Sequence, residues 1–559
     1  MVDEDYFTYE ILKVALVAVG DEMFAAMKRT SMSPIVYEIL DFAVGVTDAH
    51  GNLVAQGNGV VLFMATLDSA VRAVLEKHGP DDIHEGDIFI TNDPYGGGGT
   101  HVSDVTLVLP VFFEGTLIAF VANKAHWTEV GGMAPGGNLT DSTEVYQEGL
   151  MFPTVKLFDR GTINRPLVDM IEANVRIPDM TLGDMWASVA ANRVGERRII
   201  ELVTRYGLET VTGAMSRILD YGERMVRAEL ERMPKGEFVA EAMLDGDGLG
   251  NGPFHAEVNV TISGDRFLID FSGTDPQAPG SINTTRSGMN SFARAVYVAC
   301  TAPHVPVNGG MFRPLEVICP DGTLFTAIRP APTSVYWESG NFVIDLVWKA
   351  LAPHVPERLP AGGYLTVGST NIWGTHPDTG EFYLLVEPLA GGWGAGHDRD
   401  GDNGQFCQAN GETYNIPIEV AETRYGVRVE RYAFNPEDGG AGRFRGGKGL
   451  VIEYRCLSQA WLTTILGRHD YPPWGMAGGS DGSPNRIMIL RNDGTIEEHG
   501  KTARMPIAEG EVIRMVTGNG GGYGDPRARH QAAVAADLRD ELVSPAYAES
   551  NYGFSTVEE

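Results

Sequence analysis

Apolar residues at helical spacing open the chain and then give way to short strand-like runs. Residues 7–28 carry apolar side chains three and four positions apart, the spacing of one buried helix face. The runs 42–47 and 53–56 are expected to be strands joined by a turn, because residues 48–52 include the turn formers Asp, Gly and Asn. A further helix is predicted at 66–77, and further strands at 87–91, 104–113 and 116–122.

The pattern changes near residues 234–236, where Pro, Lys and Gly interrupt it. Before that point, residues 180–233 keep helical spacing throughout. After it, short runs predict strands and turns as far as residue 525, beginning with 238–244, 256–262 and 267–271, and a short helix at 527–543. We predict a mixed α+β fold of several segments: a helix-containing region at 1–235, a strand- and loop-rich region at 236–525, and a C-terminal helix and tail at 526–559.

Composition favours a folded protein that is rich in turns. Of 559 residues, 43% are hydrophobic and 21% are charged, which is typical of globular proteins. The 69 glycines and 31 prolines suit a protein with many turns better than a helical bundle. The formal net charge of −31 argues against binding to nucleic acid, because an acidic surface repels the phosphate backbone.

Cysteine spacing and the first residues suggest where the protein works. The four cysteines are widely separated and form no Cys-x-x-Cys pair, so neither a disulfide scaffold nor a thiolate zinc site is expected. Glu4 and Asp5 stand where a secretory leader would carry positive charge. The early apolar run at 14–19 is too short to cross a bilayer. We therefore expect a cytoplasmic protein without membrane contact.

The clearest candidate chemistry lies in the segment from Gly99 to Asp104 and in His126. His101, Asp104 and His126 are two imidazoles and a carboxylate that could converge on one ion from neighbouring strands. Three such ligands leave coordination positions open for water and substrate, as a Lewis-acid Zn, Mn or Fe ion requires. The alternative is structural: His101 and Asp104 could cap a turn, and His126 could be a hydrogen-bonded core histidine.

Two further carboxylates are candidates for the same site. Asp41 lies in an apolar segment, where a charge must be paired, ligated or protonated. It is a candidate metal ligand or proton acceptor, and hydrogen bonding to backbone donors is its structural alternative. Glu129 stands three residues after His126 and is a candidate proton-transfer group, with the capping of a turn as its alternative.

Three short motifs imitate known sites and are not expected to be functional. Residues 442–449 resemble a phosphate-binding loop, but Gly449 stands where a Ser or Thr is needed for Mg²⁺. Residues 397–402 begin like a calcium loop, but Ala409 replaces its last acidic residue. Residues 478–482 spell a serine-nucleophile turn with no helix pattern after it. The sequence thus offers no convincing ATP site or serine nucleophile.

The order of motifs along nearly the whole chain resembles the hydantoinase B/oxoprolinase family. This family includes the B-type subunit of N-methylhydantoinase, the B-half of 5-oxoprolinase, the caprolactamase small subunit, and the metal subunits of acetone and acetophenone carboxylases. The resemblance rests on the order of these segments: 29–34, 41–42, 92–95, 99–101, 126–132, 173–176, 183–184, 271–274, 308–314, 443–447 and 520–526.

The resemblance implies that the family's metal ligands fall on His101, Asp104 and His126, with Asp41 as a further candidate. It would make 1–235 the metal-binding region. It also implies a hetero-oligomer with a larger hydantoinase A-type partner, an actin-like ATPase subunit that binds ATP and Mg²⁺. One departure is Trp127, which stands where many members have a second histidine and is expected to make the pocket suit a bulkier or more apolar substrate.

These observations together predict the metal-carrying subunit of an ATP-dependent enzyme that opens a cyclic amide such as a hydantoin, a lactam or 5-oxoproline. Asp41 would complete the coordination or accept a proton, and Glu129 would donate a proton to the departing nitrogen. The alternative is the metal subunit of an ATP-dependent ketone carboxylase of the acetone or acetophenone type. A third interpretation is a scaffold without metal chemistry, against which the intact set of His101, Asp104 and His126 argues.

Overall fold

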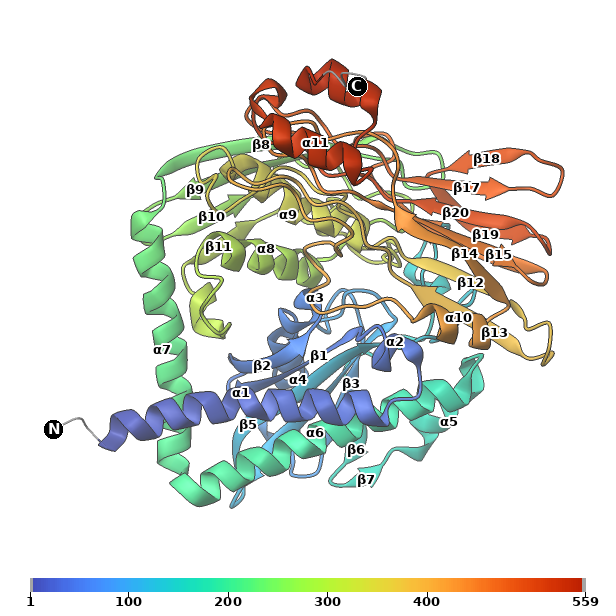
Figure 1. The fold of residues 1–559 in the computed structure, drawn as a ribbon. Helices are drawn as coiled ribbons and strands as arrows, with labels where there is room; N and C mark the ends of the chain where they lie inside the picture. Colours follow the sequence, from blue (N-terminus) through green and yellow to red (C-terminus); the bar gives the residue numbers. More distant parts are fainter. Residues whose placement is uncertain (1–3, 555–559) are drawn as a thin grey trace.

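The computed structural model describes residues 4–554, and within them helices and strands combine in the predicted α+β class (Figure 1). The described strands form four sheets. The N-terminal sheet lies below the second sheet and its helices, and the later strands extend to one side. In the described part of the chain, no helix is both long enough and apolar enough to cross a membrane.

The first sheet carries the candidate ligands and is antiparallel throughout. Its strand order is β2-β1-β5-β4-β3-β6-β7. The hairpin of β4 and β5 turns at Glu114 and Gly115, which both adopt positive φ, as a two-residue hairpin turn requires. The strands are β1 (Phe42–Asp48), β2 (Leu53–Gly59), β3 (Ile88–Thr91), β4 (Asp104–Phe113), β5 (Thr116–His126), β6 (Val155–Asp159) and β7 (Thr162–Ile163).

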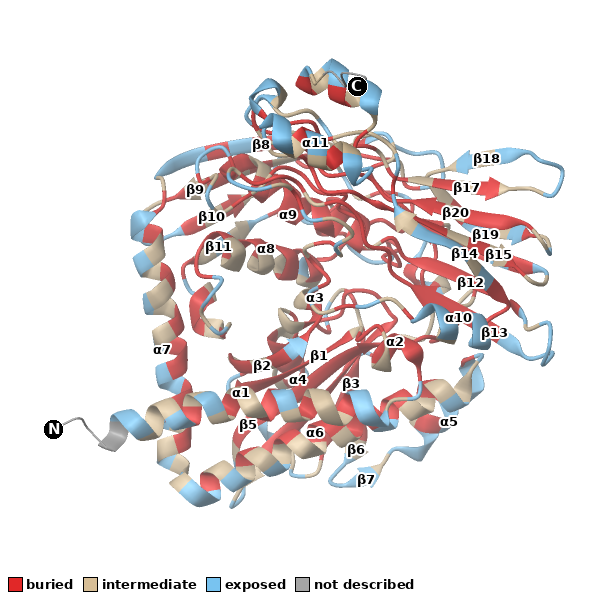
Figure 2. Cartoon of the chain, viewed as in Figure 1, coloured by how far each residue is buried: buried red, intermediate tan, exposed pale blue. Residues whose placement is uncertain are grey.

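Helices cover both faces of this sheet, which explains its long apolar strands. α1 (Glu4–Thr30) and α6 (Pro178–Tyr206) pack side by side on one face, and α4 (Leu67–His78) packs on the other. In β4, Leu107 and Leu109 join the core beneath α1 and α6, whereas Val108 joins the core beneath α4. The strands are therefore buried between helices whose outer faces are exposed in part (Figure 2).

The second sheet, of order β11-β10-β9-β8, shares one apolar core with α8 (Arg286–Cys300) and α9 (Trp337–Leu351). These two helices were not predicted. α9 is buried on nearly all sides, so it lacks the polar stripe that reveals a helix in a sequence. In α8 the buried residues do recur at helical spacing, so its pattern could have been recognised. The strands are β8 (Gly236–Leu244), β9 (Phe254–Ile262), β10 (Phe267–Asp270) and β11 (Leu315–Ile318).

Two further sheets are built from the later strands. Their orders are β13-β12-β16-β19 and β14-β15-β20-β17-β18. The strands are β12 (Thr370–Thr375), β13 (Phe382–Glu387), β14 (Val427–Phe434), β15 (Leu450–Cys456), β16 (Ala460–Ile465), β17 (Arg486–Leu490), β18 (Ile496–His499), β19 (Lys501–Ile507) and β20 (Val512–Val516).

Two predicted helices have different bounds in the structure. The stretch 180–233 is divided into α6 and α7 (Leu208–Arg232), because Gly207 between them adopts a φ of +88°, which a helix cannot contain. The helix predicted at 527–543 is reduced to α11 (Gln531–Arg539). The remaining helices are α2 (Pro34–Tyr37), α3 (Val61–Met64), α5 (Arg165–Asn174), α10 (Ile418–Arg424) and α12 (Pro545–Tyr547).

Glycine-rich segments of the second half pack backbone against backbone inside the fold. Gly447 N donates to Trp393 O at 2.8 Å, and Gly520 N donates to Gly447 O at 2.9 Å. A Cβ on Gly447 would lie 1.9 Å from Asp402 O, so no side chain fits there. The glycines that imitate a phosphate loop at 442–449 therefore serve close packing.

Candidate metal centre

The β4–β5 hairpin brings two of the three candidate ligands together. Asp104 is the first residue of β4 and His126 is the last residue of β5, and the two are directly paired across the ladder. His101 lies in the turn that enters β4, where Asp104 N donates to His101 O at 3.1 Å. All three side chains are buried, and one ligand atom from each lies within 4.8 Å of the others. We call His101, Asp104 and His126 the metal cluster.

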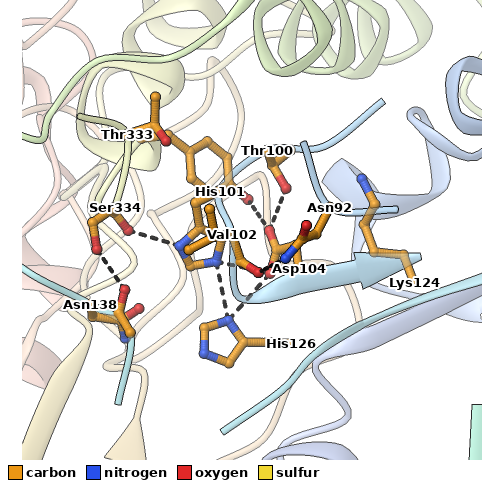
Figure 3. Close-up of polar contacts among 12 residues, drawn as sticks. Asn92, Thr100, His101, Val102, Asp104, Lys124, His126, Asn138, Thr333 and Ser334 are labelled. Carbon is orange, nitrogen blue, oxygen red and sulfur yellow. Dashed lines mark hydrogen bonds and ion pairs between the residues drawn. The ribbon is translucent and has the colours of Figure 1, made fainter. Parts of the chain in front are cut away.

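Three atoms of the metal cluster converge on one point (Figure 3). His101 Nε2 lies 2.9 Å from Asp104 Oδ1 and 3.2 Å from His126 Nδ1. His126 Nδ1 lies 3.2 Å from Asp104 Oδ1. Neighbouring ligands of a transition ion that holds imidazole nitrogen at about 2.0–2.1 Å lie roughly 3 Å apart, so these separations fit such an ion.

The tautomer of His101 supports the same conclusion. His101 Nδ1 lies 2.9 Å from Ser334 O, and because a carbonyl oxygen only accepts, Nδ1 carries the proton. A neutral His101 therefore presents the lone pair of Nε2 to the carboxylate of Asp104. Two acceptors at this distance require a proton or a cation between them. The cluster thus has the chemistry of a site that can hold a divalent transition ion.

The carboxylate of Asp104 is held by further hydrogen bonds. The hydroxyl of Thr100 donates to Asp104 Oδ2, and Tyr336 Oη lies 3.3 Å from the same oxygen. Burial acts to raise the pKa of Asp104, but the two imidazoles beside it hold that pKa well below its usual range. Asp104 is therefore ionised, as a metal ligand must be.

Glu148 supports the metal cluster from behind. Its Oε1 accepts from Thr333 N at 2.8 Å and from Ser334 N at 2.9 Å, and so fixes the loop whose carbonyl orients His101. Ser142 Oγ donates to the same oxygen at 2.8 Å. Burial raises the pKa of Glu148 to about 7, and these hydrogen bonds act in the opposite direction. Glu148 and Ser334 were not predicted from the sequence, because 186 residues separate them and neither belongs to a motif.

Asp41 lies beside the metal cluster, outside the set of atoms that converge. It precedes β1, and its backbone oxygen accepts from His126 N at 3.0 Å. Its side chain lines the same cavity as the cluster. Burial raises the pKa of Asp41 to about 7, His126 lowers it, and the nearby charge of Asp104 raises it further.

Glu129 is not brought to the metal cluster. Its carboxylate accepts from Gly131 N at 2.6 Å and pairs with Arg176 Nη1 at 3.1 Å, and it does not line the cavity. Burial raises the pKa of Glu129, whereas Arg176 lowers it. Trp127 also points away from the cavity: it is fully buried in the core, where its ring lies edge-on to Phe152 at 6.2 Å. Successive residues of an extended chain face opposite sides, so the neighbour of His126 does not shape this pocket.

A cavity opens at the metal cluster. It has an empty volume of about 570 Å³, part of which is open to solvent. One part of its wall carries the metal cluster, Asp41 and Glu387. The apolar part comes from the segments around α2 and α3, from the chain just before β12, and from β13. It includes Ile35, Ile39, Leu62, Phe63, Val367 and Val386. Polar groups on one part of the wall and apolar groups on the other suit a small organic ligand.

The fold brings two histidines and one aspartate together in a buried group that could hold a metal ion, at the wall of a cavity. The sequence profile described as hydantoinase B/oxoprolinase matches residues 5–526. The chain belongs to the hydantoinase B/oxoprolinase family, as its motifs indicated.

Similar proteins are known under several names. A protein of Pseudomonas sp. (strain NS671), named provisionally as the B-type subunit of a D-/L-hydantoinase, is 32% identical, over 99% of this chain and 96% of the relative. The beta subunit of caprolactamase from Pseudomonas jessenii is 31% identical, over 98% and 96%. The crystal structure of the ATP-dependent caprolactamase from the same organism superposes with a TM-score of 0.91, over 99% of this chain and 96% of that one.

A nucleotide-free structure of acetone carboxylase shares the fold. Its TM-score is also 0.91, at 20% identity, over 98% of this chain and 80% of that one. Two of these relatives are named as subunits, so the family contributes chains to multi-subunit enzymes.

Proposed function

We propose that this chain is the metal-carrying subunit of an ATP-dependent enzyme that hydrolyses a cyclic amide. The observation that carries the proposal is the convergence of acceptor atoms from His101, Asp104 and His126 at the wall of a partly apolar cavity. Two similar proteins are named for a hydantoin and for caprolactam, which are both cyclic amides. Their names therefore support the choice of substrate class.

We assign ATP and Mg²⁺ to a separate ATPase subunit of the hydantoinase A type. The glycine-rich segment 442–449 supports this division, because Gly447 packs against Asp402 O inside the fold and Gly449 stands where a Ser or Thr would be needed for Mg²⁺. The two relatives are named as single subunits of their enzymes, which supports a hetero-oligomer. We expect the assembly to work in the cytoplasm.

The residues of the metal cluster would hold one Zn, Mn or Fe ion. When bound, the ion would supply Lewis acidity to a water molecule and to the substrate. Amide resonance makes direct attack by water slow, and phosphorylation of the amide oxygen by the partner would remove that resonance. Water would then add to the carbonyl carbon, the C–N bond would break with its electron pair and a proton going to nitrogen, and a second water would release phosphate from the resulting acyl phosphate. Asp41 lines the cavity beside the cluster and would complete the coordination or accept a proton from the attacking water.

Glu129 has no place in this proposal as a proton donor. Its carboxylate is engaged by Arg176 and Gly131 N, and it lies off the cavity wall. We assign it a positioning role for the segment that follows His126, because its own backbone oxygen accepts from Thr181 Oγ1 at 2.9 Å.

The test uses the chain co-purified with its ATPase subunit, supplied with ATP, Mg²⁺ and a panel of hydantoins, lactams and ketones. Phosphate release and product are followed with and without bicarbonate. A hydrolase opens cyclic amides in bicarbonate-free buffer, because it needs ATP and water but no bicarbonate. Ketone-dependent turnover that needs bicarbonate, with every cyclic amide inert, would replace the hydrolase by the carboxylase. Active enzyme that contains no transition metal would remove the proposed role of the cluster.

A further inference from the structure

The described wall of the cavity carries carboxylates but no permanently charged cation. Three carboxylates line it, those of Asp41, Asp104 and Glu387. Among the described residues that line the cavity there is neither a lysine nor an arginine. Lys124 lies behind the wall, where its Nζ donates to Thr66 Oγ1 at 2.5 Å and to Gly98 O at 2.8 Å. The protein therefore offers no side-chain cation to an anionic ligand.

A bound divalent ion would already be neutralised in part by the carboxylate of Asp104, and further by Asp41 where that side chain is ionised. Glu387 is already engaged by neutral donors: its Oε1 accepts from Ile416 N at 2.9 Å and its Oε2 from Tyr454 Oη at 2.7 Å. A ligand that brought its own carboxylate would find no lysine or arginine on the described wall and would have to compete with Asp104 and Asp41 for a bound ion, which is costly.

Unpartnered polar atoms show what the cavity can recognise. Trp337 lines the cavity, and its buried Nε1–H has no acceptor among the described residues. Its ring stands edge-on to His101, with the two ring centroids 5.6 Å apart. Asn138 also lines the cavity, and its Oδ1 is buried without a donor. An N–H donor and a carbonyl acceptor next to an apolar wall match the amide group of a neutral ring.

From these observations we infer that the cavity selects an uncharged cyclic amide and rejects one that carries a carboxylate, with Trp337 Nε1 donating to a carbonyl of the ring. The inference rests on the proposed function and narrows its substrate class. Hydantoins and lactams with apolar substituents satisfy it. 5-Oxoproline, which carries a carboxylate on its ring, does not.

The test compares 5-oxoproline with 5-oxoprolinamide, which differ only in the charged group. Binding to the metal-loaded complex is measured by calorimetry, and ring opening is measured separately. The amide is expected to bind and react at least about 100-fold better, because burying a charge beside like charges costs several kcal/mol. Equal or better binding of 5-oxoproline would overturn the inference, and so would failure of both ligands and of neutral hydantoins to bind. Binding of the neutral ligand without ring opening would instead count against the proposed hydrolase while supporting the selectivity.

Substitutions at two positions locate the selectivity. Trp337→Phe keeps the ring and removes the N–H, and is expected to raise KM about 3- to 10-fold with an unchanged metal content. Thr413 lies on the cavity wall, where Thr413→Lys introduces a cation and is expected to shift the preference toward 5-oxoproline. Thr413→Met has a similar length and no charge, and should keep the preference for the amide. A Trp337→Phe enzyme with unchanged KM, or the same ratio of substrates in both Thr413 variants when both are folded, would contradict the assignment.

Discussion

Two groups of histidine and aspartate side chains in this molecule look alike but differ in what surrounds them. One is the metal cluster, and the other consists of Asp245, His469 and Asp470, which we call the Asp245 cluster. In both, the ligand atoms lie within 4.8 Å of one another. The carboxylate of Asp245 already accepts from His469 N at 3.0 Å and from Asp470 N at 3.1 Å.

A lysine next to the Asp245 cluster also distinguishes the two clusters. Lys501 donates to Gly246 O, next to Asp245. Burial lowers the pKa of Lys501, while Glu338, Asp245, Asp247 and Asp470 raise it. The Asp245 cluster therefore carries its own cation and its own donors. In the metal cluster, the point on which the three atoms converge receives the lone pairs of His101 Nε2 and of the Asp104 carboxylate, and no backbone N–H. Proximity of ligating residue types is thus insufficient to identify a metal site, and the balance of donors and acceptors decides.

The largest expected effect comes from removing a ligand. His101→Ala or His126→Ala should strip the ion and lower ring opening by more than about 100-fold, because even partners of metal ligands cost about 10- to 100-fold. His469→Ala is the matched control and should leave metal content and activity unchanged. Elemental analysis and turnover measure both. Loss of metal in the His469 variant, or its retention in the His101 variant, would break the comparison.

The next effect concerns one carboxylate at each cluster, Asp41 beside the metal cluster and Asp245 within the Asp245 cluster. Asp41→Asn should lower ring opening by about 100-fold or more, because an amide cannot accept a proton and is a weaker ligand. ATP binding by the partner should survive. Asp245→Asn is the control and should change stability without changing turnover per folded enzyme. Comparable turnover in wild type and Asp41→Asn would show that Asp41 has no chemical role.

A smaller effect is expected behind the metal cluster. Glu148→Gln keeps the size of the side chain but places a donor where Thr333 N and Ser334 N now donate, so the loop that orients His101 should shift. Metal affinity is expected to fall about 10-fold. Ser142→Ala removes one hydrogen bond to Glu148 and leaves the loop contacts intact, so its effect should be smaller. Equal affinities in the two variants would argue against this support.

The smallest effect is a pH dependence of stability in the metal-free protein. Because the pKa of Asp41 is raised to about 7 in the folded state, the folded protein holds this proton where the unfolded chain has lost it. The proton on Asp41 stabilises the folded state fully below about pH 4, and this stabilisation is lost as the pH rises through 7. The Tm of the wild type should therefore fall more than that of Asp41→Asn between pH 5 and 8. Thermal unfolding in the presence of a chelator measures this, and parallel curves would contradict it.

The sequence predicted that His101, Asp104 and His126 converge, because they lie on local elements. His101 and Asp104 share one turn, and the neighbouring strands 104–113 and 116–122 bring His126 opposite Asp104. Asp41 was recognised as a charge in an apolar segment, and it does line the cavity. Glu129 was selected by spacing alone, and spacing does not reveal that Arg176, 47 residues later, pairs with it.

The contacts that complete the site are distant in the chain and carry no pattern. Glu148, Ser334 and Trp337 come from loops and from the start of α9, a helix that is buried all round and so lacks a readable period. The fold class could be predicted, because strand and helix periods in the first 260 residues are clear. The identity of the residues that face the substrate depends on how separate segments pack, which one sequence does not encode locally.

The pairing of Asp104 with His126 makes bound metal a reporter of how the hairpin has closed. A slip of one residue between β4 and β5 would send alternate side chains to the opposite face and separate the two ligands. An ion that binds only the correctly paired hairpin stabilises it relative to the slipped hairpins by mass action. Metal supplied during refolding should therefore raise the yield of correctly formed protein, beyond its effect on the finished fold. Metal binding to the metal cluster would then also favour the correct alignment of β4 and β5.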